Sequence, residues 1–268
     1  MIKLEHTVLP SSDQMEFVIE GMRNPMNSWE KSDSGFCYDF SKKYEDGTIG
    51  CSHDCPKWSD EYYCGHSEYL KEHPEDSGFM LGNNDHSLMQ RLSNAGTDHR
   101  KFMRMMPVFV RITAPLYWWK EFDTYKVGTV ANSCSTMHKI QEKEFTLEDF
   151  SCEHLIDTCL LESVINELNI YRSIYNNYDK QTDDYKKEFS EKDIWWQMIQ
   201  LLPSSYNQTR NVMLNYEVLS NMYHSRKNHK LDEWREFCKW IEELPLSDLI
   251  TNREDETDES DNRKEDNY

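Results

Sequence analysis

The chain has 268 residues, of which 37% are hydrophobic and 13% aromatic, enough for a buried core in one large domain or two small ones. Its 49 acidic against 30 basic residues give a formal net charge of −19, which argues against a duplex nucleic-acid surface, because phosphates are neutralised by clustered Lys and Arg. No apolar run approaches the roughly 18 residues of a membrane span. The N-terminal sequence lacks a secretory signal, so we expect a cytoplasmic protein whose eight cysteines are thiols or ligands.

The negative charge is unevenly distributed along the chain. Residues 91–126 carry seven Lys or Arg against three acidic residues, and residues 207–230 carry four against one. The rest of the chain therefore totals −26. Two basic islands in an acidic chain indicate a local pocket for an anionic small molecule, with phosphate the obvious group, although chance clustering gives counts of this size as well.

The first elements are a helix and an irregular insert. Apolar residues at helical spacing predict a helix over residues 11–22, which Ser12 or Asp13 can cap. Residues 31–81 have no sustained periodicity, are polar, and contain four of the eight cysteines. We therefore interpret this segment as a cysteine-rich insert.

A strand and a buried helix are predicted after a helical stretch that ends near Gly96. Apolar and polar residues alternate over 107–113, which predicts a strand with one buried face. The pair Ala114-Pro115 then predicts the start of a helix, since proline is favoured in a first turn. Its aromatic residues as far as Tyr125 indicate that this helix is largely buried.

The second half of the chain is predicted to be helical. The periodicity indicates four helices, over residues 161–175, 195–202, 207–226 and 231–244. In the third of them Asn215 and Arg226 are three turns apart, so they are expected on one face.

The C-terminal residues differ from the rest in composition. The last 18 residues carry eight acidic and three basic side chains with a single aromatic, which predicts a disordered tail over 251–268. We therefore expect one domain over residues 1–250, with the insert at about 31–81.

The insert contains side chains that could ligate a metal. Cysteine and histidine at short spacing are typical zinc ligands, and a metal could fold a loop too polar to form its own core. The spacing between the cysteines is one residue longer than in the usual zinc pair, so surface thiols remain the alternative. The candidate zinc ligands are Cys51, Cys55, Cys64 and His66.

Two further segments concentrate polar groups among apolar ones. The first is the loop predicted after the aromatic helix, rich in hydroxyl and amide side chains over residues 129–136, which could equally be turn and capping residues. The second is the helix that carries Asn215, Glu217, Asn221 and Arg226, for which a solvated face is the alternative. A glycine-rich phosphate loop, a dinucleotide fingerprint and a His-Glu-x-x-His pair are all absent from the sequence.

Taken together, residues 88–244 resemble the flavin-dependent thymidylate synthases. That family has a Gly-His segment before a strand, an Ala-Pro helix, an Arg-His-Arg signature followed by Asn-Glu-x-Ser-x-Arg, and then Leu-Pro, Asn-x-Arg, Asn and Arg. The similar segments here are Gly96-Thr97-Asp98-His99, Ala114-Pro115, Thr124-Tyr125-Lys126, Asn132-Ser133-Cys134-Ser135, Leu202-Pro203, Asn215-Tyr216-Glu217, Asn221 and Arg226.

The sequence also departs from the family pattern. Thr124, Tyr125 and Lys126 replace Arg-His-Arg, and Glu217 replaces the arginine of Asn-x-Arg. Lysine lacks the rigid bidentate fork of arginine, so contacts to a nucleotide would differ. The resemblance therefore implies a divergent branch with a degraded Arg-His-Arg signature.

The resemblance implies an α+β fold that is mainly helical with a small antiparallel sheet. It also implies methylation of dUMP or a related pyrimidine nucleotide with FAD, NADPH and methylenetetrahydrofolate, in a homotetramer. By this resemblance the candidate flavin ligands are His99, Lys101, Arg104, Asn215 and Asn221. The candidate nucleotide ligands are Glu121, Thr124, Ser133 and Arg226, with Arg226 as the main phosphate ligand, and the candidate catalytic residues are Lys126, Cys134 and Ser135.

Three hypotheses about function remain open from the sequence. The first is a flavin-dependent enzyme similar to the thymidylate synthases, and the second is a homologue that binds nucleotide or flavin without turnover. The third is an interaction protein with a zinc-stabilised insert and an acidic tail. A flavin spectrum and nucleotide-dependent oxidation of NADPH would separate them.

Overall fold

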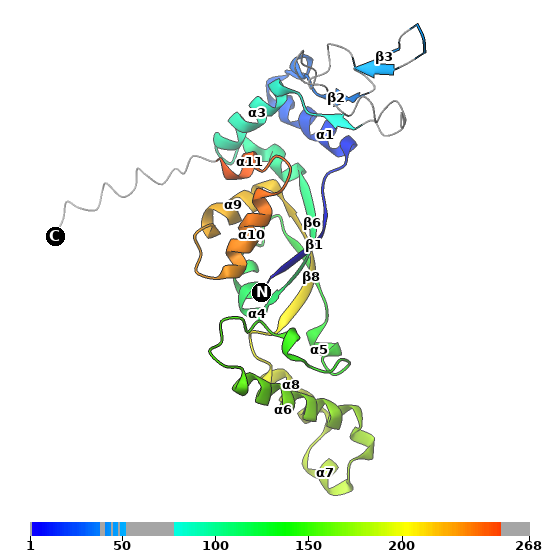
Figure 1. Ribbon diagram of the computed structural model, residues 1–268, viewed down its shortest axis with the longest axis vertical. Coiled ribbons are helices and arrows are strands. Elements are labelled where there is room, and N and C mark those ends of the chain that lie inside the picture. Colours follow the sequence, from blue (N-terminus) through cyan, green and yellow to red (C-terminus); the bar gives the residue numbers. More distant parts are fainter. Residues whose placement is uncertain (1, 38–40, 44, 48, 52–77, 253–268) are drawn as a thin grey trace, which may run out of the picture. The chain divides into compact units, whose positions relative to one another are not determined.

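The computed structural model describes residues 2–37, 41–43, 45–47, 49–51 and 78–252 (Figure 1). Its described part forms two compact units. Of the described residues, those within 2–7, 109–213 and 225–240 form unit 1, and those within 8–108, 214–224 and 241–252 form unit 2. The prediction of one domain over residues 1–250 stays a prediction, because the boundaries between these units fall inside continuous strands and helices.

A four-stranded sheet, with strand order β1-β6-β8-β7, is built mostly from unit 1. Its strands are β1 (Lys3–Val8), β6 (Pro107–Pro115), β7 (Val130–Ser133) and β8 (Asn207–Asn215). In β6 the residues Val108, Val110, Ile112 and Ala114 are buried and alternate with more exposed ones, as the sequence pattern predicts. Strand β7 pairs antiparallel with β8, which places Ser133 opposite Arg210.

The core of unit 1 is aromatic. Helix α4 (Leu116–Phe122) contributes Trp118, and helix α10 (Asp232–Glu242) contributes Trp234 and Phe237. The ring centroids of Trp118 and Trp234 are 4.8 Å apart, and those of Trp118 and Phe237 are 5.7 Å apart. All three rings are almost fully buried. Such large apolar rings supply much of the hydrophobic stabilisation of a domain, which explains how so polar a chain keeps α4 and α10 together.

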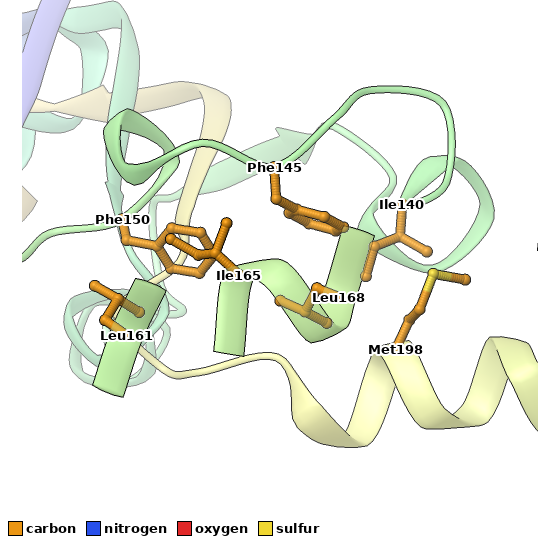
Figure 2. Packing of buried hydrophobic residues seen from close by; sticks show 7 residues of the cluster. All are labelled: Ile140, Phe145, Phe150, Leu161, Ile165, Leu168 and Met198. Carbon is orange, nitrogen blue, oxygen red and sulfur yellow. The ribbon is translucent and has the colours of Figure 1, made fainter. Parts of the chain in front are cut away.

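A second apolar cluster in unit 1 joins two helices that lie side by side, α6 (Cys159–Asn176) and α8 (Glu191–Leu201) (Figure 1). Figure 2 shows its buried side chains, with Leu168 of α6 and Met198 of α8 among them, together with Ile140, Phe145 and Phe150 from the preceding segment. The shorter elements of this region are α5 (Thr136–Lys139), η5 (Leu147–Asp149), η6 (Tyr178–Lys180) and α7 (Asp183–Glu188).

Unit 2 is mainly helical. Its helix α1 (Ser12–Arg23) begins with a capping box, in which Ser11 and Gln14 satisfy each other's backbone N–H groups. The cap is therefore Ser11, one residue before the predicted Ser12 or Asp13. The remaining elements are η1 (Asn24–Met26), η2 (Trp29–Lys31), β2 (Gly35–Phe36), β3 (Ser41–Lys43), β4 (Ile49–Cys51), β5 (Phe79–Met80), α3 (Asn83–Asn94), η4 (Arg100–Met105), most of α9 (Tyr216–Arg226) and α11 (Asp248–Thr251).

One buried carboxylate fixes the start of α3 in unit 2. Asp85 is fully buried and accepts a hydrogen bond of 2.5 Å from Nε of Arg23, which is itself buried. It also accepts bonds of 2.7 Å and 2.6 Å from the hydroxyls of Ser32 and Ser34. Buried charges are tolerated when they are paired and hydrogen-bonded, and here both carboxylate oxygens of Asp85 accept hydrogen bonds, although Nη2 of Arg23 has no partner among the described residues. The Asp85 carboxylate therefore ties α1 and the 32–34 segment to α3.

The structure corrects three sequence predictions. Residues 207–226 are not one helix, because the buried alternation of β8 runs through Asn215 and α9 begins only at Tyr216. Asn215 and Arg226 therefore do not share a helix face. The predicted 129–136 loop contains strand β7, which β8 stabilises by pairing. Pro115 ends β6 and caps α4 instead of lying in the first helical turn.

Two predicted segments fall largely outside the described residues. These are the insert, of which residues 38–40, 44, 48 and 52–77 are not described, and the acidic tail from residue 253. Among the described residues, no helix is long and apolar enough to cross a membrane.

Candidate functional site

A carboxylate near the C-terminal end of α4 gathers three donors in unit 1. Oε2 of Glu121 accepts hydrogen bonds of 2.9 Å from Nη1 of Arg226 and of 2.9 Å from Nε1 of Trp234. Nε2 of His229 lies 3.3 Å from the same oxygen. We refer to Glu121, Tyr125, Arg226, His229 and Trp234 as the Glu121 cluster. Because its members come from the end of α4, the end of α9 and the start of α10, the cluster depends on how these helices pack in unit 1.

The guanidinium of Arg226 is held in one orientation. Its Nε donates to the hydroxyl oxygen of Tyr125 at 2.9 Å, in addition to the bond from Nη1 to Glu121. The guanidinium carbon lies 4.9 Å from the ring centroid of Trp234 and 5.6 Å from that of Tyr125. A planar cation that stacks on aromatic rings and donates at fixed angles loses little further entropy when it binds a ligand. The side chain keeps 20% of its surface exposed, so a ligand can reach it.

Two groups of the cluster make no hydrogen bond to any described residue. These are Nη2 of Arg226, a donor, and Oε1 of Glu121, an acceptor. They belong to side chains joined by the Arg226–Glu121 ion pair, so this pair has one donor and one acceptor left for a ligand. Such a pair complements a ring edge that has a carbonyl oxygen next to an N–H group.

The tautomer of His229 follows from its contacts. The backbone N–H of Leu231 donates to Nδ1 of His229 at 3.1 Å, so Nδ1 is an acceptor and carries no proton. In the neutral ring the proton is then on Nε2, which faces Glu121.

We predict that the Nε2–H tautomer dominates in the folded protein at alkaline pH. In a ¹⁵N NMR spectrum of His229, Nδ1 should resonate as the unprotonated nitrogen and Nε2 as the protonated one. In His229→Asn the shorter side chain can keep only the acceptor near the Leu231 N–H. In His229→Gln the longer side chain can still place an N–H donor near Glu121. We therefore expect His229→Gln to preserve the cluster better than His229→Asn. A spectrum that places the proton on Nδ1 would contradict the assignment.

A second polar group in unit 1 lies where β7 leads into α5. The buried side chain of Gln208 accepts from Nε of Arg210 at 2.9 Å and donates to the Thr136 hydroxyl at 2.9 Å. The Arg210 guanidinium stacks on Trp119 at 4.1 Å and donates from Nη1 to Asp123 at 2.7 Å. This network fixes the backbone beside Ser133, Cys134 and Ser135.

The candidate catalytic residues are exposed, and within the described part of the chain they form no hydrogen bond or ion pair with one another. Cys134 continues β7, since its N–H donates to the Thr209 carbonyl at 3.1 Å. The Ser135 hydroxyl caps α5 by accepting from the His138 N–H at 3.1 Å. Lys126 lies exposed in the turn from α4 to β7, where Gly128 adopts a φ of +80° that favours glycine. Ser135 thus has a structural role in the helix cap, and Lys126 is accessible to an anion.

The other two candidate nucleotide ligands differ in their surroundings. Thr124 lies directly after α4, and its hydroxyl donates to the Glu121 carbonyl at 2.7 Å, which closes the end of the helix. Ser133 is exposed on β7 opposite Arg210. Of the nucleotide candidates, the structure therefore brings Glu121 and Arg226 into contact through side chains, with Thr124 beside them.

Unit 2 contains a carboxylate between two arginines. Glu217, in the first turn of α9, is buried and accepts from Nη2 of Arg104 at 3.1 Å and from Nε of Arg100 at 3.4 Å. Arg104 Nε also donates to Glu217, and this bond raises the pKa of Arg104. Arg100 is buried, whereas Arg104 is half exposed. The group therefore keeps one positive charge in excess, on the side that solvent reaches.

The other four flavin candidates differ in their exposure and in their hydrogen bonds. His99 and Lys101 are exposed at the start of η4, five and three residues before Arg104 respectively, and Nζ of Lys101 lies 3.7 Å from Oδ1 of Asp98. Asn215 does not face solvent on a helix, because its side chain caps α9 by accepting from the Val218 N–H at 2.9 Å. Asn221 is exposed on α9. All five flavin candidates belong to unit 2, whereas all the nucleotide and catalytic candidates belong to unit 1.

The predicted zinc site is not tested by the structure. Cys55, Cys64 and His66 lie outside the described residues, and of Cys51 only the backbone in β4 is described. Within the described part of the chain, no group of three or more His, Cys, Asp or Glu side chains is arranged to hold a metal ion.

Comparison with solved structures finds proteins with a similar fold. A crystal structure of thymidylate synthase X (ThyX) from Helicobacter pylori with FAD and dUMP has a TM-score of 0.55 at 12% sequence identity, and the match covers 94% of this chain and 98% of that one. A second structure of the same bacterial enzyme, complexed with FAD and dUMP, gives 0.54 at 12% over the same shares. The chain therefore has a ThyX-like fold. No protein-family model matches the sequence, and no curated protein is significantly similar to it.

The structure confirms the predicted α+β fold class, mainly helical with a small antiparallel sheet. Sequence reasoning did not single out Arg210, His229 or Tyr117 as parts of polar networks. The hydroxyl of Tyr117 donates to the buried carboxylate of Glu233, and burial together with this bond raises its pKa. Arg210 belongs to the second basic island, but because the sequence predicted a helix there, it did not indicate that Arg210 lies in β8 opposite Ser133.

Proposed function

We propose that this chain is a flavin-dependent enzyme similar to the ThyX thymidylate synthases, which reductively methylates dUMP or a related pyrimidine nucleotide. The observation that carries the proposal is the Arg226–Glu121 pair on a ThyX-like fold, because the two neighbours of that fold are described with FAD and dUMP. NADPH and methylenetetrahydrofolate would be the co-substrates. A cytoplasmic homotetramer is part of the same proposal.

The pair suits the base of the nucleotide better than its phosphate. Nη2 of Arg226 can donate to a ring carbonyl while Oε1 of Glu121 accepts from the adjacent ring N–H, which is the pattern that uracil presents. A phosphate next to Glu121 would instead meet a carboxylate, and like charges at this distance repel. We therefore assign the ring edge to Arg226 and Glu121, and the phosphate to the exposed cation Lys126, with Thr124 and Ser133 as hydroxyl donors.

The residues of unit 2 fit the phosphate groups of FAD. Arg104 is half exposed and makes no hydrogen bond through Nη1 to any described residue, so a donor remains for an anion. Lys101 and His99 are exposed on the same short segment, and Asn221 adds an exposed amide on α9. We propose that Lys101 and Arg104 would hold the pyrophosphate and that His99 and Asn221 would bind polar atoms of the cofactor. Asn215 would contribute indirectly, by capping α9.

The protein's part in the reaction would be positioning and electrostatic stabilisation. Bound FAD would supply the hydride chemistry, as cofactors do. Arg226 would stabilise negative charge that develops on the ring oxygen, held in place by Tyr125 and Trp234. Lys126, Cys134 and Ser135 would line the approach to the base, where Cys134 carries the exposed thiol.

A second candidate is a homologue that binds nucleotide and flavin without turnover. Tyr125, which stands where the family has the histidine of Arg-His-Arg, uses its hydroxyl to hold Arg226 and so has a structural task in this chain. Glu217 likewise takes the position of a family arginine and neutralises Arg104 in part. Both changes retain a folded site, which is what a binding protein needs.

The two candidates are separated by spectra and turnover. The purified protein with added FAD is expected to retain a flavin absorbance band after gel filtration and to oxidise NADPH only when dUMP and methylenetetrahydrofolate are present. A retained flavin that dUMP perturbs without any oxidation of NADPH would favour the second candidate. A protein that binds neither flavin nor dUMP would contradict both.

A further inference from the structure

A pocket of about 280 Å³ lies in unit 1, lined by His138, Gln141, Tyr175, Glu191, Lys192 and Trp195. It is formed by the end of α6, the start of α8 and the segment that contains α5. None of these six residues belongs to the Glu121 cluster or to the candidate flavin and nucleotide ligands. Its volume is near the lower end of typical small-molecule sites, roughly 300 Å³, and suits a ligand of one or two rings.

The aromatic walls of the pocket are fixed by a packed core. Tyr175 and Trp195 are partly buried against the apolar cluster of α6 and α8, which includes Leu168 and Met198. Figure 2 shows the side chains of Leu168 and Met198 near Ile140, the residue immediately before Gln141. Rings that pack on a core on one side and line a pocket on the other offer a preformed apolar surface, which favours a planar ligand.

Gln141 has an acceptor that the protein leaves unused. Its Nε2 donates to the His138 carbonyl at 3.3 Å, which identifies Oε1 as the other atom of the amide. Oε1 is buried and has no hydrogen-bond partner among the described residues. The backbone of Gln141 is fixed as well, because its carbonyl accepts from Nδ2 of Asn176 at 3.0 Å. A buried acceptor without a partner is unfavourable, and a ligand N–H would satisfy it.

The charged side chains of the pocket favour an acidic ligand. Lys192 forms no ion pair with any described residue, and the His138 ring makes no hydrogen bond within the same part of the chain. Among the described lining residues Glu191 is the acidic one. The first turn of α8 also holds Asp193, whose carboxylate is bound to Ser190 in the helix cap, so Lys192 is the group that can pair with an acid.

We propose that this pocket is a binding site for a small planar acid that carries a ring N–H group. The ring stacks between Tyr175 and Trp195, the ring N–H donates to Oε1 of Gln141, and the carboxylate pairs with Lys192. None of its lining residues is assigned to nucleotide or flavin, and the site does not depend on the proposed reaction.

Three kinds of matched probe test the proposal by saturation-transfer NMR titration of the full chain. Indole-2-carboxylate and indole-5-carboxylate contain all three features, the corresponding N-methyl acids lack the N–H donor, and indole lacks the acid. The better of the two indole acids is expected to bind at least tenfold more tightly than its N-methyl derivative and than indole, since each lost contact is worth about a factor of ten.

Two variants show whether these contacts are made in this pocket. Gln141→Leu should reduce the affinity for the indole acid to that of the N-methyl acid and leave the N-methyl acid unaffected. Lys192→Met should reduce it to that of indole and leave indole unaffected. Lys187→Met, an exposed lysine of α7 outside the pocket, is the matched control and should change nothing.

The competing location is tested in the same titration. Arg226→Ala should leave the affinity for the indole acid unchanged, because Arg226 belongs to the Glu121 cluster. Equal affinities for the three kinds of probe, no binding of either acid, or loss of binding only in Arg226→Ala would overturn the proposal. Circular dichroism of each variant distinguishes a lost contact from a lost fold.

Discussion

Replacing Arg226 by alanine is expected to weaken the binding of dUMP by about a hundredfold or more. Removal of one partner from a desolvated charged hydrogen-bond network costs about 3 kcal/mol, which corresponds to roughly two powers of ten in affinity. Two losses combine here, because the ring carbonyl loses its donor and Glu121 loses the arginine that neutralises it. Calorimetric titration of the flavin-loaded protein with dUMP measures the effect.

The Arg226 prediction has a matched control on the neighbouring helix. Lys239 of α10 is also a cation in an ion pair, with Glu236 one turn away, but both side chains are exposed. Surface pairs of this kind contribute about 0–1 kcal/mol, so Lys239→Ala should leave the affinity for dUMP unchanged. Unchanged affinity in Arg226→Ala would remove Arg226 from the nucleotide site.

Exchange of Glu121 for glutamine separates the two roles that Arg226 could have. If Arg226 and Glu121 bind the ring edge, Glu121→Gln loses a charged acceptor, and dUMP should bind about tenfold more weakly. If Arg226 binds the phosphate, the same variant removes a repulsive charge, so dUMP should bind more tightly. Titration with 2-deoxyribose 5-phosphate, which has no base, should show no loss in Glu121→Gln under the first assignment. A tighter complex with dUMP would restore the phosphate assignment.

The sequence predicts the elements whose pattern is local. The alternation over 107–113 identifies β6, and helical spacing identifies α6 and α10 within a few residues, because each buries one regular face. The prediction of a single helix over residues 207–226 is wrong for 207–215, where Val212 and Leu214 are buried on one face of a strand. Their strand conformation depends on pairing with β7, which is remote in the sequence.

For the candidate site, the sequence likewise indicates which residues belong to it but not the contacts between residues that are distant in the sequence. Arg226 and Glu121 were predicted as members of a nucleotide site, but their contact joins residues 105 positions apart and no spacing rule reveals it. Tyr125 looked like the loss of a family histidine, whereas in the structure its hydroxyl orients Arg226. The role of Glu217 is similar, since the charge that replaces an arginine is matched by Arg100 and Arg104 from a distant segment. Compensation of this kind is visible only once the chain is folded.

Exchange of Asp85 for asparagine is expected to lower the free energy of unfolding by about 3–5 kcal/mol, because it leaves the buried charge of Arg23 without its partner. The loss should be seen as a lower midpoint in urea unfolding at neutral pH, with an unchanged slope. Asp98→Asn, the same chemical change at an exposed aspartate of unit 2, is the control and should alter the midpoint little. Equal midpoints for Asp85→Asn and the unaltered chain would contradict the structural role.

The contribution of the Asp85 carboxylate to the free energy of unfolding depends on pH. Burial by itself raises the pKa of Asp85, but hydrogen bonds from Ser34, Ser32 and Arg23 outweigh it, so the pKa lies below its usual value. The unfolded chain, in which this aspartate titrates near about 3.9, then binds more protons than the folded one as the pH falls. The contribution is fully present above about pH 4 and is lost as the pH falls through the lower pKa of the folded state.

The difference in unfolding free energy between the unaltered chain and Asp85→Asn should therefore be constant from pH 7 to about pH 5 and shrink below about pH 4. A difference that stayed constant into strong acid would mean that the Asp85 carboxylate is not the group that titrates.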